Sequence, residues 1–509
     1  MKNLSDKQYN RLIIQQNDII NSEHKHILVS AGPGSGKTYT LVKKIIKDLE
    51  MIEKECGVIA CSFTNEASKQ LKNKLGNSCN FEASFIGTID SFVLTEIIEP
   101  FKNRFLKTLG YDSNIIKLKI RMPEIKSEAS VITRIGNAIS IKSRIDDYVN
   151  RWLADFSIGR YEISFASYIV AELMINNMKL VKEYLQNRYR VIYVDEAQDL
   201  NEFQINFIRT LVNKCHLDVV LIGDKNQSIY KFRGARPEMF YNMKEHGFKE
   251  YVIDVSVRCH KSILDFANKY IDNAYLIAEK NEIVNVKKYD WPSVDYLNNL
   301  IGNYMILFED NLSAEKCFNH LKAQNANVIL ARNITVTDKD FRDNFYDLLE
   351  ETLTFYFNYD NGKLTYSSDE FYEYLSDFID VGQLKKLKDI KKYENVICYF
   401  EEILHLSGDY IPKVTKLELL SQINDEKIIN RYKKYEQVNR IMTIHASKGL
   451  EAEHVFVRIN RLPTTYDDEY KRKLYVGFTR AISSLYICFT NNVIGTFLDG
   501  EITKIINEL

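Results

Sequence analysis

Two adjacent carboxylates at the end of an apolar stretch mark the first place where this sequence could do chemistry. In VIYVDEAQDL (191–200), four residues suited to a buried strand are followed at once by Asp195 and Glu196. Burying an unpaired carboxylate costs several kcal/mol. A strand that ends in two acids therefore predicts a cation or a substrate beside them.

A glycine-rich loop far upstream supplies that partner. Its residues, AGPGSGKT (31–38), lie between the apolar stretch HILVS and an amphipathic segment, and they have the spacing of a Walker A phosphate-binding loop. Alanine stands first, where glycine is commoner. Glycines let backbone N–H groups turn towards phosphate oxygens, and the start of the following helix adds its positive dipole end. The predicted nucleotide-binding residues of the loop are Ala31, Gly32, Gly34, Ser35, Gly36, Lys37 and Thr38.

The loop and the two acids together predict hydrolysis of a nucleoside triphosphate, with ATP and Mg²⁺ as the expected ligands. Lys37 would reach the β- and γ-phosphates, and the Thr38 hydroxyl would ligate Mg²⁺. Asp195 would hold the same ion, directly or through water, and Glu196 would orient and deprotonate the attacking water. A purely structural glycine-rich turn is the alternative for the loop taken alone, and the acids downstream argue against it.

Composition limits the class of protein. The 509 residues are too many for a single core, so we expect two to four compact units. Lys+Arg and Asp+Glu number 68 and 69, and this balance neither indicates nor excludes a nucleic-acid partner. The eight cysteines are scattered without a CxxC pair, which favours reduced thiols. A polar N-terminus and the lack of a long apolar run predict a cytoplasmic protein without a membrane span.

A series of further motifs, taken in order with the phosphate loop, resembles the superfamily 1A DNA helicases of the UvrD/Rep/PcrA type. The resemblance covers most of the chain, and it implies an ATPase that moves on DNA in the 3′–5′ direction. The motifs that carry it are CSFTNEASKQL (61–71), IGTIDSF (86–92), VDEAQD (194–199), IGDKNQSIYKFRGA (222–235), VSVRCHKSIL (255–264), VILARN (328–333), IMTIHASKGLEAEHVFV (441–457) and YKRKLYVGFTRA (470–481).

Three residues of the later motifs resemble the family's γ-phosphate contacts. Gln227 follows the apolar stretch VVLIGD, whereas Arg258 and Arg480 lie far along the chain from the loop. The charge that develops on the γ-phosphoryl group needs cations close by, which is the role of arginine fingers. If both arginines come from a second lobe, the site is complete only when the lobes close on ATP. A surface or ion-paired arginine is the alternative for each position taken alone.

The resemblance also implies the adenine and ribose contacts, with one departure from the family. Gln16 has the family's spacing to the phosphate loop and would read the adenine edge, while Gly449 and Glu451 are expected at the nucleotide, Glu451 on the ribose. Where the family carries an adenine-stacking aromatic and an arginine, this chain has Val257 and Tyr39. We hypothesise that Tyr39 supplies the stacking face and Val257 only an apolar contact. The alternative is that Tyr39 packs within its own helix.

The DNA-binding residues implied by the resemblance combine aromatic rings with hydroxyl and amide donors, the usual mode of sequence-tolerant single-strand binding. Taken singly, each ring is more often a core residue, so the assignment depends on motif position. Asp90 stands where many relatives carry histidine, so one DNA contact is expected to be missing. Phe232 stands where the family has tryptophan, which gives a smaller stacking platform. The predicted residues are Phe63, Thr64, Asn65, Thr88, Tyr230, Phe232 and His445.

The order of strands and helices around the motifs predicts an α/β protein with two RecA-like lobes, each a parallel sheet with ligands at the carboxyl ends of its strands. Lobe 1A would comprise residues 1–93 and 180–255, and lobe 2A residues 256–340 and 436–509. The mostly helical segments 94–179 and 341–435 would be the 1B insertion and a reduced 2B insertion.

Two functions are open. The first is a translocase or helicase on single-stranded or tailed DNA. The second follows from the short chain, and from the lack of the family's duplex-contact motif in 341–435. In these respects the sequence is similar to the helicase-like subunit of Gabija anti-phage defence systems. That likeness implies a DNA-sensing ATPase that regulates an OLD-family nuclease subunit, with little unwinding of its own. A kinase is less favoured, because it would not need the later motifs.

Overall fold

The structure is a computed structural model of the chain. It describes residues 6–53, 55–63, 65–76, 83–112, 114–116, 118–121, 138–231, 234–243, 247–271, 276–278, 286–288, 292–324, 326–331, 348–349, 352–353, 355–356, 371–372, 375, 379, 381–408, 411, 413–424, 439–459, 468–489 and 497–507. The chain divides into two compact units, which are described separately: Met1–Val286 with Pro463–Ser483 and Glu501–Leu509, and Lys287–Leu462 with Ser484–Gly500.

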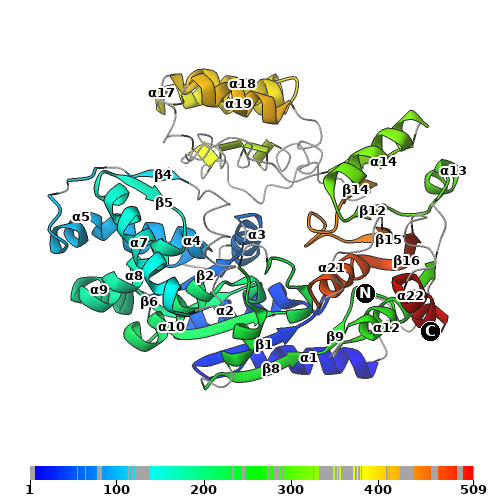
Figure 1. Ribbon diagram of the computed structural model, residues 1–509, viewed down its shortest axis with the longest axis horizontal. Helices are drawn as coiled ribbons and strands as arrows, with labels where there is room; N and C mark the ends of the chain where they lie inside the picture. The colour runs from blue at the N-terminus through cyan, green and yellow to red at the C-terminus, as the bar shows by residue number, and fades with distance from the viewer. Residues whose placement is uncertain are drawn as a thin grey trace. The chain divides into compact units, whose positions relative to one another are not determined.

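The first unit is built on a six-stranded sheet in the order β3-β2-β6-β7-β1-β8 (Figure 1). Every neighbouring pair in it is parallel. Most of its strands are apolar because both faces of the sheet are covered by helices, whereas the edge strand β8 begins with the exposed Lys249 and Glu250. They are β1 (His26–Ala31), β2 (Gly57–Ser62), β3 (Phe85–Thr88), β6 (Tyr189–Val194), β7 (Asp218–Gly223) and β8 (Lys249–Ile253).

Alternate residues of these strands face two separate cores. In β1, Ile27 and Val29 belong to one buried cluster, whereas Leu28 between them belongs to the other. The first cluster is closed by three helices: α1 (Asp6–Ile20), α2 (Lys37–Met51) and α3 (Asn65–Leu75). The second is closed mainly by α5 (Glu99–Thr108), α7 (Ala138–Ser157), α8 (Phe165–Asn177), α9 (Lys179–Arg188) and α10 (Glu202–Cys215).

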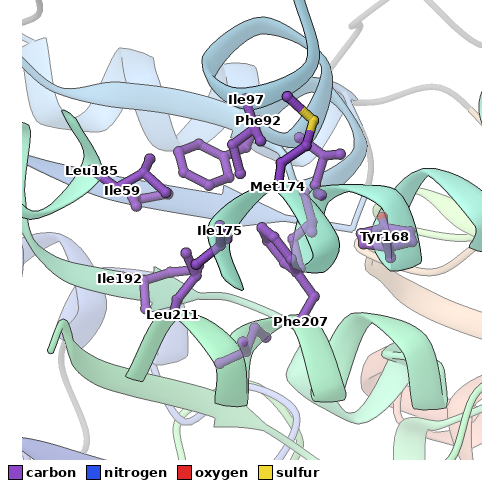
Figure 2. Packing of buried hydrophobic residues seen from close by; sticks show 14 of the residues in the cluster. Ile59, Phe92, Ile97, Tyr168, Met174, Ile175, Leu185, Ile192, Phe207 and Leu211 are labelled. Atoms are coloured by element: carbon purple, nitrogen blue, oxygen red, sulfur yellow. The ribbon is translucent and has the colours of Figure 1, made fainter. Parts of the chain in front are cut away.

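The segment 94–179 packs directly on this second face. Figure 2 shows Met174 and Ile175 of α8 among side chains of α10 and the strand residues Ile59 and Ile192. In its described residues the segment is mostly helical, and it also contains a two-stranded parallel sheet that the sequence pattern did not indicate. The further elements here are α4 (Ile89–Phe92), the π-helical η2 (Val93–Ile98), β4 (Lys119–Arg121) and β5 (Arg160–Glu162).

The remaining elements of the first unit follow the ends of its strands. Short 3-10 helices come directly after β6 and β7, and α12 and α21 lie on segments that are far apart in the sequence. These elements are η3 (Ala197–Asp199), η4 (Lys225–Gln227), α11 (Pro237–Asn242), β9 (Val255–Ser256), α12 (Lys261–Tyr270), β10 (Ile277–Ala278) and α21 (Asp468–Phe478).

A second six-stranded sheet has the order β11-β16-β15-β12-β14-β13, and β12 pairs in parallel with both β14 and β15. Two parallel-strand sheets with helices confirm the predicted α/β class, whereas the lobe boundaries stay a prediction. The elements are β11 (Val286–Lys288), α13 (Val294–Asn298), β12 (Tyr304–Phe308), α14 (Asn311–Ala323), β13 (Ile329–Leu330), β14 (Arg440–Thr443), β15 (Ala452–Ile459), β16 (Ala481–Phe489) and α22 (Phe497–Asn507).

The described part of segment 341–435 is helical and has a hydrophobic core of its own. That core runs from Leu348 to Ile423 and contains no residue from outside this stretch. Its elements are α17 (Val381–Leu384), η7 (Lys385–Leu387), η8 (Ile390–Lys392), α18 (Val396–Leu406) and α19 (Lys413–Ile423). In none of the described ranges is a helix both long and apolar enough to cross a membrane.

Candidate functional site

The carboxyl edge of the first sheet gathers the residues that the sequence singled out. Because its strands are parallel, their carboxyl ends meet at one edge, where ligands of open α/β sheets bind. The phosphate loop follows β1, the acidic pair follows β6, and Gln227 follows β7. Phe63 directly follows β2, and Thr88 is the last residue of β3. The order of the strands therefore lines up the predicted phosphate contacts beside the predicted DNA contacts.

The phosphate loop has the backbone conformation that its glycines allow. Gly34 and Gly36 have φ values of 72° and 77°, in the left-handed region that favours glycine. The Ser35 hydroxyl donates to the Gly32 carbonyl at 2.7 Å, and Lys37 Nζ donates to the same oxygen at 3.4 Å. The lysine is thus folded over the loop, at the place from which it would meet a phosphate.

The strand end at β9 closes one side of the loop. The Ser256 hydroxyl donates to the Pro33 carbonyl at 2.7 Å, and the Val257 amide donates to the Gly34 carbonyl at 2.9 Å. A Cβ atom at Gly34 would lie 2.7 Å from Ser256 Oγ and 2.9 Å from the Arg258 amide nitrogen. Arg258 is therefore held directly against the phosphate loop, within the first unit.

Thr38 and Asp195 meet, as magnesium binding requires. The Thr38 hydroxyl donates to Asp195 Oδ2 at 3.2 Å. Burial, and next the charge of Glu196, raises the pKa of Asp195 to about 6, while the Lys37 ammonium acts in the opposite direction. A hydroxyl and a carboxylate beside a phosphate loop are the hard oxygen ligands that Mg²⁺ prefers. These two residues therefore fit the ion.

Glu196 occupies a strained backbone position and is held by a neighbour. Its φ of 54° and ψ of 38° lie in the left-handed region, which is uncommon outside glycine and clusters at functional sites. Gln198 Nε2 donates to Glu196 Oε2 at 2.5 Å. At its other end, Gln198 Oε1 accepts from the Asp224 amide at 2.9 Å. The fully buried Gln198 side chain thus ties the predicted base to the end of β7.

A second chain of hydrogen bonds joins the residues that follow β7 to those that follow α21. Gln227 Nε2 donates to Asp224 Oδ2 at 2.7 Å, and Arg480 Nη2 donates to Gln227 Oε1 at 3.2 Å. Asp224 and Arg480 are buried, and burial raises the pKa of Asp224. Gln227 and Arg480, predicted as γ-phosphate contacts from motifs 253 positions apart, therefore touch each other in the first unit.

The predicted adenine contacts lie around the same loop. Gln16 is buried, and its Nε2 donates to the Ser35 carbonyl at 3.2 Å, so it also supports the phosphate loop. Its neighbour Gln15 bonds Asp254 instead, through Nε2 to Oδ1 at 2.8 Å. Tyr39 and Val257 are 54% and 40% exposed, and Lys43 Nζ, one turn further along α2, lies over the Tyr39 ring at 5.9 Å from its centroid.

Two predicted DNA-stacking rings stack on each other. The Phe63 and Tyr230 centroids lie 5.2 Å apart, with 23° between the ring planes. The Thr88 hydroxyl caps α4 by accepting from the Ser91 amide at 3.1 Å, so it is already in use. At the position without the family's histidine, Asp90 accepts a hydrogen bond from Tyr168.

Other predicted residues lie elsewhere. Thr64 and Phe232 fall outside the described residues, and of Asn65 only the backbone, at the start of α3, is described. His445, Gly449 and Glu451 belong to the second unit, in the turn between β14 and β15. Gly449 has a φ of 85°, which explains a glycine there.

Gln198, Asp224 and Ser256 were not selected from the sequence, although each bonds a predicted site residue or the phosphate loop. The available signal was position: each lies within a few residues of a motif residue at a strand end. A buried polar side chain at a strand end needs a partner, and these partners are the site itself.

Comparison with known proteins decides the family. The description "UvrD/REP helicase N-terminal domain" matches residues 12–155 and 96–247, and "UvrD-like helicase C-terminal domain" matches residues 440–488. These matches contain the phosphate loop, the acidic pair and the last two motifs, whereas the motifs at 255–264 and 328–333 lie between them. The chain belongs to the UvrD-like superfamily 1A helicases. It is therefore an enzyme of the ATP-hydrolysing helicase type.

Several relatives of this helicase family match the chain. Gabija protein GajB of Bacillus cereus is 25% identical over 93% of this chain and 95% of that protein. A probable DNA helicase II homolog of Mycoplasma capricolum is 24% identical over 95% of this chain and 85% of that protein. ATP-dependent DNA helicase Rep of Buchnera aphidicola is 26% identical over 48% of this chain and 42% of that protein.

Proposed function

We propose that this UvrD-like helicase is a DNA-dependent ATPase that moves on single-stranded DNA, in the 3′–5′ direction by resemblance to its family. One observation carries the proposal: along one sheet edge, the phosphate loop and acidic pair stand beside the stacked rings of Phe63 and Tyr230. Phosphate chemistry and base stacking thus share one rigid scaffold.

The residues at the loop would bind and activate ATP. Backbone amides of the loop and Lys37 would cradle the phosphates. Thr38 and Asp195 would hold Mg²⁺, which, when bound, neutralises charge on the β- and γ-oxygens. Glu196 would take a proton from the attacking water, in the orientation that Gln198 imposes.

Gln227, Arg258 and Arg480 would complete the site around the γ-phosphate. Arg480 is buried and bonded to Gln227, and in this proposal its guanidinium would lie next to the place where charge develops. A preorganised cation there lowers the barrier without reorganising during the reaction. Gln227 is also joined to Asp224, so the three groups form one hydrogen-bonded unit.

Hydrolysis and DNA contact would be coupled through one short segment. Gln227 contacts the predicted catalytic arginine, and Tyr230, three residues later, stacks on Phe63. A change at the γ-phosphate that moves Gln227 would therefore shift Tyr230. A nucleobase entering between the two rings would move the same segment in return.

The direct test is ATP hydrolysis by the purified protein with and without single-stranded DNA, beside strand separation of a 3′-tailed duplex. Stimulated hydrolysis that is lost in the Glu196→Gln variant is the expected result. Hydrolysis that no DNA stimulates in any form would refute the proposal. A 5′-tailed duplex separated in preference to the 3′-tailed one would refute the direction.

A second function is favoured by the extent of one match. GajB aligns over 95% of its length, whereas the DNA helicase II homolog aligns over 85% and Rep over only 42% of their own lengths. We propose, as the alternative, a DNA-sensing ATPase of an anti-phage defence complex that regulates an OLD-family nuclease subunit. Stimulated hydrolysis without strand separation, together with a nuclease activity that depends on added ATPase, would favour it over the autonomous motor.

A further inference from the structure

Helix α1 is bonded to both sides of the phosphate-loop site through consecutive residues. Gln16 Nε2 donates to the Ser35 carbonyl of the loop at 3.2 Å. Gln15 exchanges two hydrogen bonds with Asp254: its Nε2 donates to Asp254 Oδ1 at 2.8 Å, and its Oε1 accepts from the Asp254 amide at 3.2 Å. Because both glutamines belong to one continuous helix, these bonds tie the loop to the segment that contains Asp254.

Asp254 is held at each of its polar groups. The Arg11 guanidinium bonds both carboxylate oxygens, with Nε donating to Oδ1 at 3.0 Å and Nη2 donating to Oδ2. The Asp254 carbonyl accepts from the Ile277 amide at 2.7 Å. A two-pronged pair of arginine and carboxylate fixes the orientation of both planar groups, which a single ammonium contact does not. We call Arg11, Gln15 and Asp254 the α1 clamp.

The segment after Asp254 leads directly to the phosphates. Asp254 lies between β8, which pairs with β1, and β9. The next residues bond the loop, through the Ser256 hydroxyl to the Pro33 carbonyl and the Val257 amide to the Gly34 carbonyl. Arg258 follows at once. A shift of Asp254 would therefore move Arg258 relative to the loop.

The ion pair of the clamp contributes more to geometry than to stability. The side chains of Arg11 and Asp254 are 51% and 14% exposed. An ion pair with an exposed partner contributes little to the free energy of unfolding, because water solvates its charge and salt screens it. The buried side chains of Leu12 and Ile19 already attach α1 to the sheet. The effect of the pair should therefore appear in the chemistry of the site.

We propose that Arg11 and Asp254 are positioning residues for ATP hydrolysis. Through the α1 clamp they hold Arg258 at the place, relative to the phosphate loop, that the γ-phosphate requires. The pair acts through Arg258 and not on the nucleotide itself. The inference rests on the γ-phosphate contact that the proposed function gives to Arg258. It deepens that function by assigning control of the arginine to two residues outside the motifs.

The test measures kcat and nucleotide affinity of the full chain with Arg11→Met, which keeps an apolar stem and removes both bonds to Asp254. A displacement of about 1 Å at a reacting site lowers a rate about 100-fold, and the bonds of Ser256 and Val257 limit the shift, so kcat should fall about 10-fold. Affinity for a non-hydrolysable ATP analogue should fall about fivefold, whereas affinity for ADP, without a γ-phosphate, should stay within about twofold.

A double substitution shows whether the pair acts through Arg258. Arg258→Ala alone should lower kcat and the affinity for the ATP analogue by more than Arg11→Met does. In the Arg258→Ala background, Arg11→Met should cause no further loss of kcat or of that affinity. A further loss of the same size would overturn the inference, because the pair would then act on another part of the site.

Two matched variants separate positioning from charge and stability. Arg160→Met removes a similar pair of the same unit, in which Arg160 is 46% exposed and lies 3.5 Å from Asp155; kcat and both affinities should stay within about twofold. Arg11→Lys keeps the charge and one bond, so its kcat should lie between those of Arg11→Met and the wild type. If Arg11→Met lowers only the melting temperature, its role is structural and the inference is overturned.

Failure of this inference is distinguishable from failure of the proposed function. Reduced kcat in Arg258→Ala beside an unaffected Arg11→Met would refute the inference alone. Wild-type kcat in Arg258→Ala would refute both the γ-phosphate contact and the inference. The two affinities are measured without DNA, so hydrolysis that no DNA stimulates would refute the motor function and leave the affinity result standing.

Discussion

Replacing Gln198 with leucine should uncouple the predicted catalytic base from the rest of the site. The side chain is fully buried, donates to Glu196 at 2.5 Å and accepts from the Asp224 amide at 2.9 Å. Leucine has a similar volume and makes neither bond. Glu196, in its strained left-handed conformation, would lose the bond from Gln198, and the Asp224 amide would lose this acceptor.

The expected losses follow from those two bonds. A hydrogen bond to a charged group contributes about 1.5–3 kcal/mol, and a buried unpaired amide costs about 1–3 kcal/mol. Glu196 is partly exposed and leucine gains from burial, so we expect the free energy of unfolding to fall by about 2–4 kcal/mol. A base displaced by about 1 Å should lower kcat by about 100-fold. KM should change little, because the phosphate loop is untouched.

Steady-state ATP hydrolysis with single-stranded DNA, measured well below the unfolding temperature, tests this reasoning. Gln204→Leu is the matched control. Gln204 is also buried, and its side chain bonds the Tyr168 hydroxyl at 3.0 Å rather than Glu196 or the Asp224 amide. Gln204→Leu should lower stability and leave kcat within about threefold. In a Glu196→Gln background, Gln198→Leu should cause no further loss of kcat. If Gln198→Leu keeps a wild-type kcat while its stability falls, Gln198 has only a structural role.

Three other substitutions probe the same unit. Gly34→Ala should weaken nucleotide binding by more than about 100-fold in a fluorescent-nucleotide titration. The reason is that φ at Gly34 is 72° and the added Cβ would meet the Arg258 amide. Binding as tight as in the wild type would show that the loop adapts. Phe63→Ala should weaken single-strand binding by about 5- to 150-fold, the value of one stacked base, and an unchanged affinity for an oligothymidine would remove the ring from the DNA track. Tyr39→Ala should clearly weaken ATP binding while Val257→Ala does little, and equal small effects in both would contradict the stacking hypothesis.

Features set by local sequence were predictable, and those set by distant partners were not. The phosphate loop could be located from its letters because Gly34 and Gly36 dictate its conformation themselves. Apolar strands with helices between them were enough for the α/β class. The β4–β5 sheet was missed because each strand has only three residues, too few for a period to show.

The role of Gln198 was hidden for a different reason. Its acceptor bond comes from Asp224, 26 positions later, and nothing in DEAQD states where that amide lies. In the same way, the letters of two motifs do not show that Phe63 and Tyr230 stack on each other, because only the order of the strands brings them together.

The contact between Gln227 and Arg480 has a consequence for how the protein is made. The two residues are separated by 253 positions, and a ribosome that adds about 5–20 residues per second needs about 13–50 s to cover that distance. During this interval the nascent chain already contains the phosphate loop and the acidic pair but lacks the buried guanidinium. We therefore expect chains truncated before Arg480 to bind nucleotide and to leave it intact, so that hydrolysis begins only once translation has passed that residue.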